Sequence, residues 1–189
     1  MAETEPDRRA ALLDAAIAVF LRYGFKKASM DAVAKAAGLS RQGVYLHHPT
    51  KEALFRAALE HLGASARRAA AAAIARDDRS VEERVFGAFE ALHVTVANSE
   101  HMDELLATAG QILGESLVQL EDSIVADLAR ALKSLGVAAA WQEQGISAKV
   151  LAETLYAASQ GFKQRKLSRA AYLERMRAAV RIVCRPVDG

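Results

Sequence analysis

Cysteine, proline and long apolar runs are scarce in this chain of 189 residues, and each scarcity excludes a class of protein. Cys184 is the only cysteine, so the chain can build neither an intrachain disulfide nor a zinc site that needs several cysteines. No apolar run approaches the ~18 residues that a membrane-spanning helix requires. The charged start MAETEPDRR lacks the apolar core of a signal peptide, so we expect a cytoplasmic protein without a membrane segment.

Only three prolines interrupt the chain, at positions 6, 49 and 186. The stretches between turn signals are rich in Ala, Leu, Arg, Glu and Lys, which favour helices because they lose little side-chain freedom there. Hydrophobic residues make up 52% of the sequence, which is enough for a buried core. We therefore predict an all-α protein.

Positive charge is concentrated near the N-terminus, although the net charge of the whole chain is only +2. Residues 8–61 contain nine Lys or Arg against four Asp or Glu, whereas residues 62–189 contain sixteen of each sign. A local positive excess suits a polyanion such as DNA, because each neutralised phosphate releases condensed counterions. Many solvated helical surfaces carry a similar excess, so charge alone does not decide between the two interpretations.

Turn and capping residues divide the N-terminal third into four expected helices. Residues 7–23 form an apolar stripe at helical spacing that Gly24 ends. Two short helices follow at 30–37 and 41–47, and a long helix begins after Pro49. The hydroxyls that can cap these last three helices belong to Ser29, Ser40 and Thr50.

The remaining chain shows further helical stripes after a polar loop at RDDRS, residues 76–80. Periodic apolar residues predict five helices there, at about 81–97, 102–109, 112–135, 147–167 and 169–184. We expect a loop or broken turn at 137–145, around Trp141.

Two short helices joined by a four-residue turn and braced by longer helices form a helix-turn-helix, whose second helix fits the major groove. The segment SMDAVAKAAGLSRQGVYLHHPTKEALF, from Ser29 to Phe55, resembles the DNA-binding signature of the TetR family of regulators. The features that carry the resemblance are the Ala-Gly-Leu-Ser turn, the Val44-Tyr45 pair, His47, the Lys51-Glu52 start of the next helix and the preceding Tyr23-Gly24-Phe25.

The resemblance implies an all-α fold of about nine helices with two domains. An N-terminal three-helix helix-turn-helix DNA-binding domain would occupy residues 1–62, with the fourth helix running on to about 76. Residues 63–189 would form a helical ligand-binding and dimerisation domain. The implied function is a transcriptional repressor that a small-molecule ligand releases from its operator.

The first turn of the second short helix would meet base edges. An arginine suits guanine O6 and N7, and a glutamine suits adenine N6 and N7. These roles are expected for Arg41 and Gln42, while Gly43 permits a close approach. Ordinary solvated polarity is the alternative interpretation of Arg41 and Gln42.

Other residues of the motif would contact the DNA backbone, which positions a protein without carrying sequence information. The resemblance implies phosphate contacts for Tyr45, His47 and Lys51, to which Ser29 and Ser40 can add hydroxyl or helix N-terminal contacts. A core role is the alternative for Tyr45.

One position departs from the family pattern. The family usually has an aromatic residue, most often phenylalanine, where this chain has His48. Such a phenylalanine normally packs between the first and fourth helices, so His48 predicts a more polar or looser packing there.

The resemblance also implies dimerisation and a ligand cavity in the second domain. The last two helices would pair with those of a second copy through Leu151, Leu155, Ala158, Phe162, Tyr172, Met176, Ala179 and Val183. These stripes are equally compatible with the core of the chain itself. Candidates for ligand contact are Phe89, His93, Gln111, Glu115, Trp141, Tyr156 and Gln160, each of which could instead be an ordinary surface or packed residue.

An enzyme would need a converging acid, base, nucleophile or metal cluster, and the sequence offers no such set. His47 and His48 are adjacent and so point in different directions on a helix, and no His-Glu-x-x-His motif occurs. We therefore expect no catalytic residue, metal or cofactor. The expected partners are a palindromic DNA duplex, a second copy and an unidentified small molecule. A ligand-independent DNA-binding regulator or architectural protein is the alternative.

Overall fold

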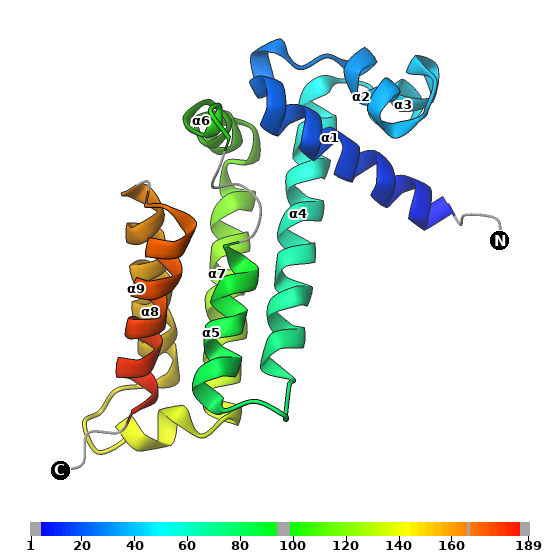
Figure 1. Ribbon diagram of the computed structural model, residues 1–189. Helices are drawn as coiled ribbons and strands as arrows, with labels where there is room; N and C mark the ends of the chain where they lie inside the picture. The colour runs from blue at the N-terminus through cyan, green and yellow to red at the C-terminus, as the bar shows by residue number, and fades with distance from the viewer. Residues whose placement is uncertain (1–4, 94–98, 166, 186–189) are drawn as a thin grey trace. The chain divides into compact units, whose positions relative to one another are not determined.

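The computed structural model describes residues 5–93, 99–165 and 167–185 (Figure 1). These residues form helices and their connections, with no strand, in agreement with the predicted all-α class. The α-helices are α1 (Glu5–Lys27), α2 (Met30–Ala37), α3 (Arg41–His47), α4 (Lys51–Ile74), α5 (Val81–Leu92), α6 (Met102–Leu113), α7 (Glu115–Ser134), α8 (Ala148–Gln164) and α9 (Arg169–Cys184). A 3₁₀-helix, Val137–Trp141, connects α7 to α8.

Side-chain caps explain why several helices begin where the sequence predicts. The hydroxyl of Ser29 accepts a hydrogen bond from Ala32 N at 3.1 Å, and that of Thr50 accepts one from Ala53 N at 3.0 Å. Ser80 and Glu83 form a reciprocal capping box at the start of α5. Each cap satisfies backbone donors that the helix itself leaves unpaired.

Helix boundaries differ from expectation at glycines. Gly24 does not end α1 but kinks it, with φ 74° and ψ 167°, and helical turns continue to Lys27. The break between α6 and α7 falls at Gly114, whose φ is 50°. α5 ends at Leu92, and residues 94–97 of the helix expected there lie outside the described residues.

The chain forms two compact units, the first of which combines residues 1–65 with residues 98–117. Within this unit α6 packs against α1 and adds Leu105, Ala109 and Leu113 to the same core. Phe20, Phe25 and Phe55 meet at the centre, with ring centroids 4.9 to 5.9 Å apart. The first unit thus has its own aromatic core.

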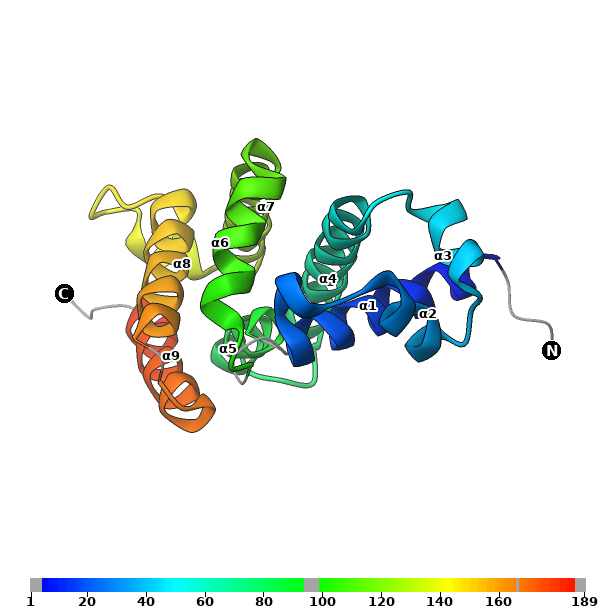
Figure 2. The same ribbon diagram turned by 90° about the horizontal axis from the view of Figure 1, so that it is seen from above.

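The second unit contains residues 66–97 and 118–189. Its α8 and α9 lie side by side in both views, and α5 packs against α9 (Figures 1 and 2). The indole Nε1 of Trp141 donates to Val183 O at 2.9 Å, which ties the 3₁₀-helix to the end of α9. None of the helices in the described part of the chain combines the length and apolarity that a membrane crossing requires.

Candidate nucleic-acid interface and cavity

The turn between α2 and α3 is fixed by local hydrogen bonds. Gly38 adopts a left-handed conformation, with φ 66°, which only glycine takes without strain. Leu39 N donates to Ala34 O at 2.9 Å, and the Ser40 hydroxyl accepts from Gly43 N at 3.0 Å. Val44 is fully buried beneath this turn, so the opposite side of α3 faces solvent.

The exposed side of α3 carries Arg41, Gln42, Tyr45, Leu46 and His47. The Arg41 guanidinium pairs with Asp31 on α2, with Nε and Oδ1 3.1 Å apart. It also lies 5.6 Å from the centroid of the Tyr45 ring. Two of the residues expected to contact DNA, Arg41 and Tyr45, therefore lie against each other on one surface, and Asp31 is a partner that sequence reasoning missed.

Lys51 has a different environment from the one expected of a phosphate contact. Its ammonium donates to the carbonyl oxygens of Phe25, Ala28 and Lys26, at 2.8, 3.2 and 3.3 Å. It also lies 4.5 Å from the centroid of the Phe25 ring. An ammonium has three donors, so these contacts engage all of them and tie α4 to the corner between α1 and α2.

The same corner is also held by α6 and by Ser99, which precedes it. Lys26 N donates to Glu104 Oε1 at 2.7 Å, and the Ser99 hydroxyl donates to Leu21 O at 2.5 Å. Sequence reasoning missed both contacts because their partners are 78 residues apart and no local pattern marks them. The backbone of Lys26 is thus hydrogen-bonded both to the carboxylate of Glu104, through its N–H, and to the ammonium of Lys51, through its carbonyl.

His48 is buried at the end of α3, with 7% of its surface exposed. Burial lowers the pKa of its imidazole, and the positive charges of Arg9 and His47 lower it further. Its Nε2 atom has no hydrogen-bond partner in the part of the chain that the structure describes. A buried imidazole whose pKa is lowered therefore occupies the place where the family pattern has an aromatic ring.

The sequence of α1 to α4 matches a known family. Residues 12–58 match the model of bacterial regulatory proteins of the tetR family. The DNA-binding segment of the chain thus matches the TetR family. A relative from Bacillus subtilis (strain 168), the uncharacterized HTH-type transcriptional regulator YfiR, is 41% identical over 58 residues. That stretch is 31% of this chain and only 28% of the relative's length.

Solved structures extend the likeness from this segment to nearly the full length of the chain. A transcriptional regulator from Rhodococcus sp. Rha1 is 25% identical, with a TM-score of 0.67, over 96% of this chain and 94% of that one. The reduced form of NemR from E. coli is 20% identical, with a TM-score of 0.72, over 97% and 100%. These structures confirm the predicted fold, an N-terminal helix-turn-helix followed by a helical domain.

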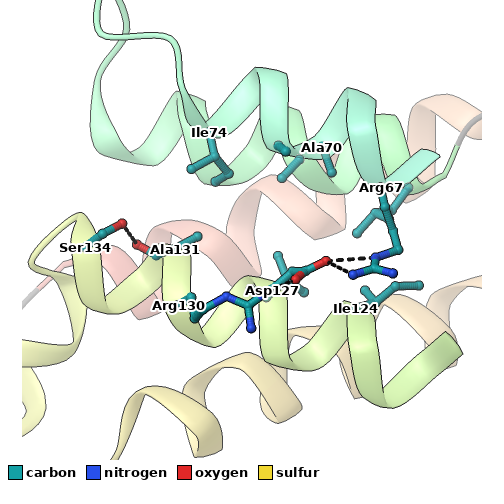
Figure 3. Close-up of a pocket in the computed structure, with 12 residues that line it drawn as sticks. Arg67, Ala70, Ile74, Ile124, Asp127, Arg130, Ala131 and Ser134 are labelled. Carbon is teal, nitrogen blue, oxygen red and sulfur yellow. Dashed lines mark hydrogen bonds and ion pairs between the residues drawn. The ribbon is translucent and has the colours of Figure 1, made fainter. Parts of the chain in front are cut away.

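The second unit contains a cavity of about 390 Å³ between α4, α5 and α7 (Figure 3). Asp127 accepts two hydrogen bonds from Arg67, at 2.6 and 2.8 Å, and another from Arg130. The other lining residues are mainly apolar, namely Ala70, Ala71, Ile74, Ala88, Leu92, Ile124, Leu128 and Ala131, with Ser134.

None of the residues expected to contact a ligand lines this cavity. Phe89 is buried in the core, and the Trp141 indole is already bonded. Gln111 and Glu115 are exposed and belong to the first unit. The sequence identified apolar and polar stripes but not which side chains leave space between them.

Tyr156 and Gln160 meet at Glu121 on α7. Gln160 Nε2 lies 3.5 Å from Glu121 Oε1, and burial together with the Glu121 charge raises the pKa of Tyr156 to about 12. Lys163, one turn further along α8, donates to Leu92 O at 3.4 Å, and burial lowers its pKa while Glu121 opposes the change. Sequence reasoning missed Glu121 and Lys163.

His93 lies against Tyr172, with ring centroids 3.5 Å apart and planes 10° from parallel. Neither nitrogen of the imidazole has a hydrogen-bond partner among the described residues. Burial lowers the pKa of His93 to about 4, and the charges of Lys163 and Arg169 act in the same direction. The Tyr172 hydroxyl pairs with that of Ser159 at 2.7 Å.

The structure favours the core interpretation for most residues of the expected dimer interface. Five of the eight are buried in the core of the single chain, namely Leu151, Leu155, Tyr172, Met176 and Val183. Ala158, Phe162 and Ala179 are half-buried. The exposed large apolar side chains on α8 and α9 are instead Val150 and Ile182.

Among the described residues, no group of three His, Cys, Asp or Glu could hold a metal ion.

Proposed function

We propose that this protein is a sequence-specific DNA-binding transcriptional regulator that inserts α3 into the major groove of duplex DNA. The observation that carries the proposal is the exposed polar side of α3, held on a capped turn within the family's DNA-binding segment. The excess of Lys and Arg over residues 8–61 supports it, because phosphate contacts supply much of the affinity for DNA. A ligand-independent regulator or architectural protein is the alternative.

The proposal is tested by selecting bound duplexes from a random library and measuring their dissociation constants. Gln42→Ala should weaken binding to the selected duplex by about 1–3 kcal/mol and relax preference at one position per half-site. Gln142→Ala, at an exposed position outside the first unit, is the control and should bind as the wild type does. Equal losses on selected and random DNA would contradict a base-reading role for α3.

A second copy of the chain would supply the other half-site contact. Two-fold dimers bind palindromic sites because each recognition helix meets one half-site, about one DNA turn, or 34–36 Å, from the other. Exposed Val150 and Ile182 support a dimer surface on α8 and α9. We expect protection of both half-sites in footprints. Protection of a single half-site at saturation would contradict the dimer.

We further infer that a small, largely apolar ligand enters the cavity of the second unit and releases the protein from DNA. The cavity exceeds the roughly 300 Å³ at which ligand pockets begin, and most of its lining is apolar. A ligand found by screening should bind free protein and the DNA complex with dissociation constants that differ by the factor it imposes on DNA binding.

A substitution that fills the cavity tests whether the ligand binds there, and a matched substitution on the same helix shows whether any loss of response comes from damage to the fold instead. Ala131→Phe places a ring in the cavity and should abolish the ligand response while leaving DNA binding intact. Ala126→Phe, at an exposed position on the same helix, is the matched control and should respond normally. If both variants respond equally, the ligand binds elsewhere.

A further inference from the structure

Leu46 is the most exposed of the large apolar residues that the structure leaves in solvent, with 85% of its surface accessible. It lies on α3, among polar and amphipathic side chains. A single exposed leucine is common on protein surfaces and needs no function by itself. Leu46 lies on the helix proposed to enter the major groove, so the direction and the apolar chemistry of its side chain decide whether it can contact a base.

The helical period gives that direction. Residues of an α-helix are spaced by about 100°, so the positions two before and two after a buried residue both lie about 160° from it. Val44 is the buried residue of α3, and Gln42 and Leu46 are those two positions. Both therefore point directly away from the core, about 40° from each other. Arg41 and Tyr45 lie nearer to Val44, on the flank of the helix.

Contacts on the flank support the same division. Arg41 is already paired with Asp31 and lies over the Tyr45 ring. Gln42 and Leu46 have no such partner among the hydrogen bonds and ion pairs of the described residues. The side of α3 that points away from the core thus carries one amide group, from Gln42, and one isobutyl group, from Leu46.

Only one group in the major groove matches an isobutyl side chain. The C5-methyl of thymine is the apolar group that the major-groove base edges display, whereas the other edges present hydrogen-bond donors and acceptors. A glutamine side chain pairs with adenine N6 and N7. Side chains four apart on a helix are about 5–6 Å apart, which is close to the separation of one or two base-pair steps.

We propose that Leu46 is a specificity-determining residue that reads a thymine methyl group, one or two base pairs from an adenine read by Gln42. Each half-site would then contain A·T pairs beneath the centre of α3. The assignment rests on the proposed function, DNA reading by α3, and adds to it the chemical group that is read.

Replacing thymine by deoxyuridine tests the assignment, because this change removes only the methyl group. In the duplex selected by the full-length protein, each thymine is replaced in turn, in both half-sites. Dissociation constants are measured for the wild type, for Leu46→Ala and for Leu106→Ala, which truncates another exposed leucine, on α6. Circular dichroism checks that both variants fold, as expected for exposed side chains.

We expect one thymine per half-site whose replacement weakens wild-type binding by about fourfold, as loss of one buried methyl group predicts. Leu46→Ala should bind the thymine and deoxyuridine duplexes alike at that position, while Leu106→Ala keeps the fourfold preference. A new selection with Leu46→Ala should lose its preference for thymine there.

Two results would overturn the assignment, and they are distinguishable. If Leu46→Ala discriminates thymine from deoxyuridine at every position as the wild type does, DNA reading stands but Leu46 takes no part in it. The leucine is then an ordinary exposed residue. If the wild type shows no sequence selectivity at all, the proposed function fails and the assignment fails with it.

Discussion

At the scale of single residues, two buried histidines are expected to lower the free energy of unfolding as the pH decreases. His93 has a pKa of about 4 in the folded chain, whereas its ordinary value is 6.5. Between these values the unfolded chain binds a proton that the folded chain does not, so the free energy of unfolding falls as pH decreases. His48 acts in the same direction because burial lowers its pKa too.

His93→Phe tests this effect, because a phenyl ring keeps the stacking on Tyr172 without a group that takes up a proton. The wild type should lose stability on the order of 3 kcal/mol through His93 between pH 7 and pH 4. Urea unfolding at several pH values should show a clearly smaller loss for the variant. An identical pH dependence in both proteins would contradict burial of a neutral His93.

Lys51 gives a second test at the scale of single residues, because a phosphate contact and a structural contact have different signatures. Each phosphate contact contributes about 0.9 to the slope of log affinity against log salt. Lys51→Met keeps the aliphatic stem but leaves the carbonyls of Phe25, Lys26 and Ala28 without their donor. We expect a loss of about 1–3 kcal/mol in unfolding free energy and an unchanged salt slope. A reduced slope with unchanged stability would restore the phosphate role.

At the scale of helices, the main feature is the kink that Gly24 introduces into α1. A Cβ atom on Gly24 would lie 2.6 Å from Glu104 Oε2, and the positive φ of 74° is itself strained for any other residue. Gly24→Ala should therefore destabilise the protein by about 1–3 kcal/mol and weaken DNA binding, because the corner carries α2.

Gly110→Ala is the matched control for the kink. Gly110 lies within α6 with open space around its Cβ position, so alanine should stabilise the helix by about 0.5–1 kcal/mol. Denaturant unfolding of the two variants should give changes of opposite sign. If both are equally tolerated, neither the kink nor its contact with Glu104 constrains the chain.

Helices whose ends depend on local residues are the ones that the sequence predicts well. α2, α3 and α9 begin and end where their capping residues indicate, since a cap acts within four residues. The break at Gly114 was expected a few residues earlier, because a glycine in sequence does not reveal its φ. The contact of Glu104 with Lys26 and the partners of Lys51 depend on tertiary packing, which periodicity cannot show.

At the scale of the whole molecule, periodicity predicts which face of a helix is buried but not which chain covers it. The stripes of α8 and α9 were compatible with either a second copy or the chain's own core, and most of their residues lie in the core of the second unit. The cavity escaped prediction for a related reason, because it depends on how small alanines of α4, α5 and α7 face one another.

Association of two copies is tested at Ile182, which exposes 70% of its surface on α9. Ile182→Glu places a charge on the proposed dimer surface and should shift sedimentation towards the monomer, with loss of affinity for a palindromic duplex. Val118→Glu changes an exposed valine of α7 and should leave the dimer intact. A dimeric Ile182→Glu would exclude this part of α9 from the interface.

The inclusion of α6 in the first unit has a consequence for the folding of the protein during its synthesis on the ribosome. Leu105, Ala109 and Leu113 belong to the same core as α1 and α4, yet they are synthesised about 40 to 50 residues after position 65. At about 5–20 residues per second, that interval lasts roughly 2–10 seconds. During it the emerging helix-turn-helix lacks the carboxylate of Glu104 and part of its apolar cover. A nascent chain therefore gains its complete DNA-reading unit only after α6 has left the exit tunnel.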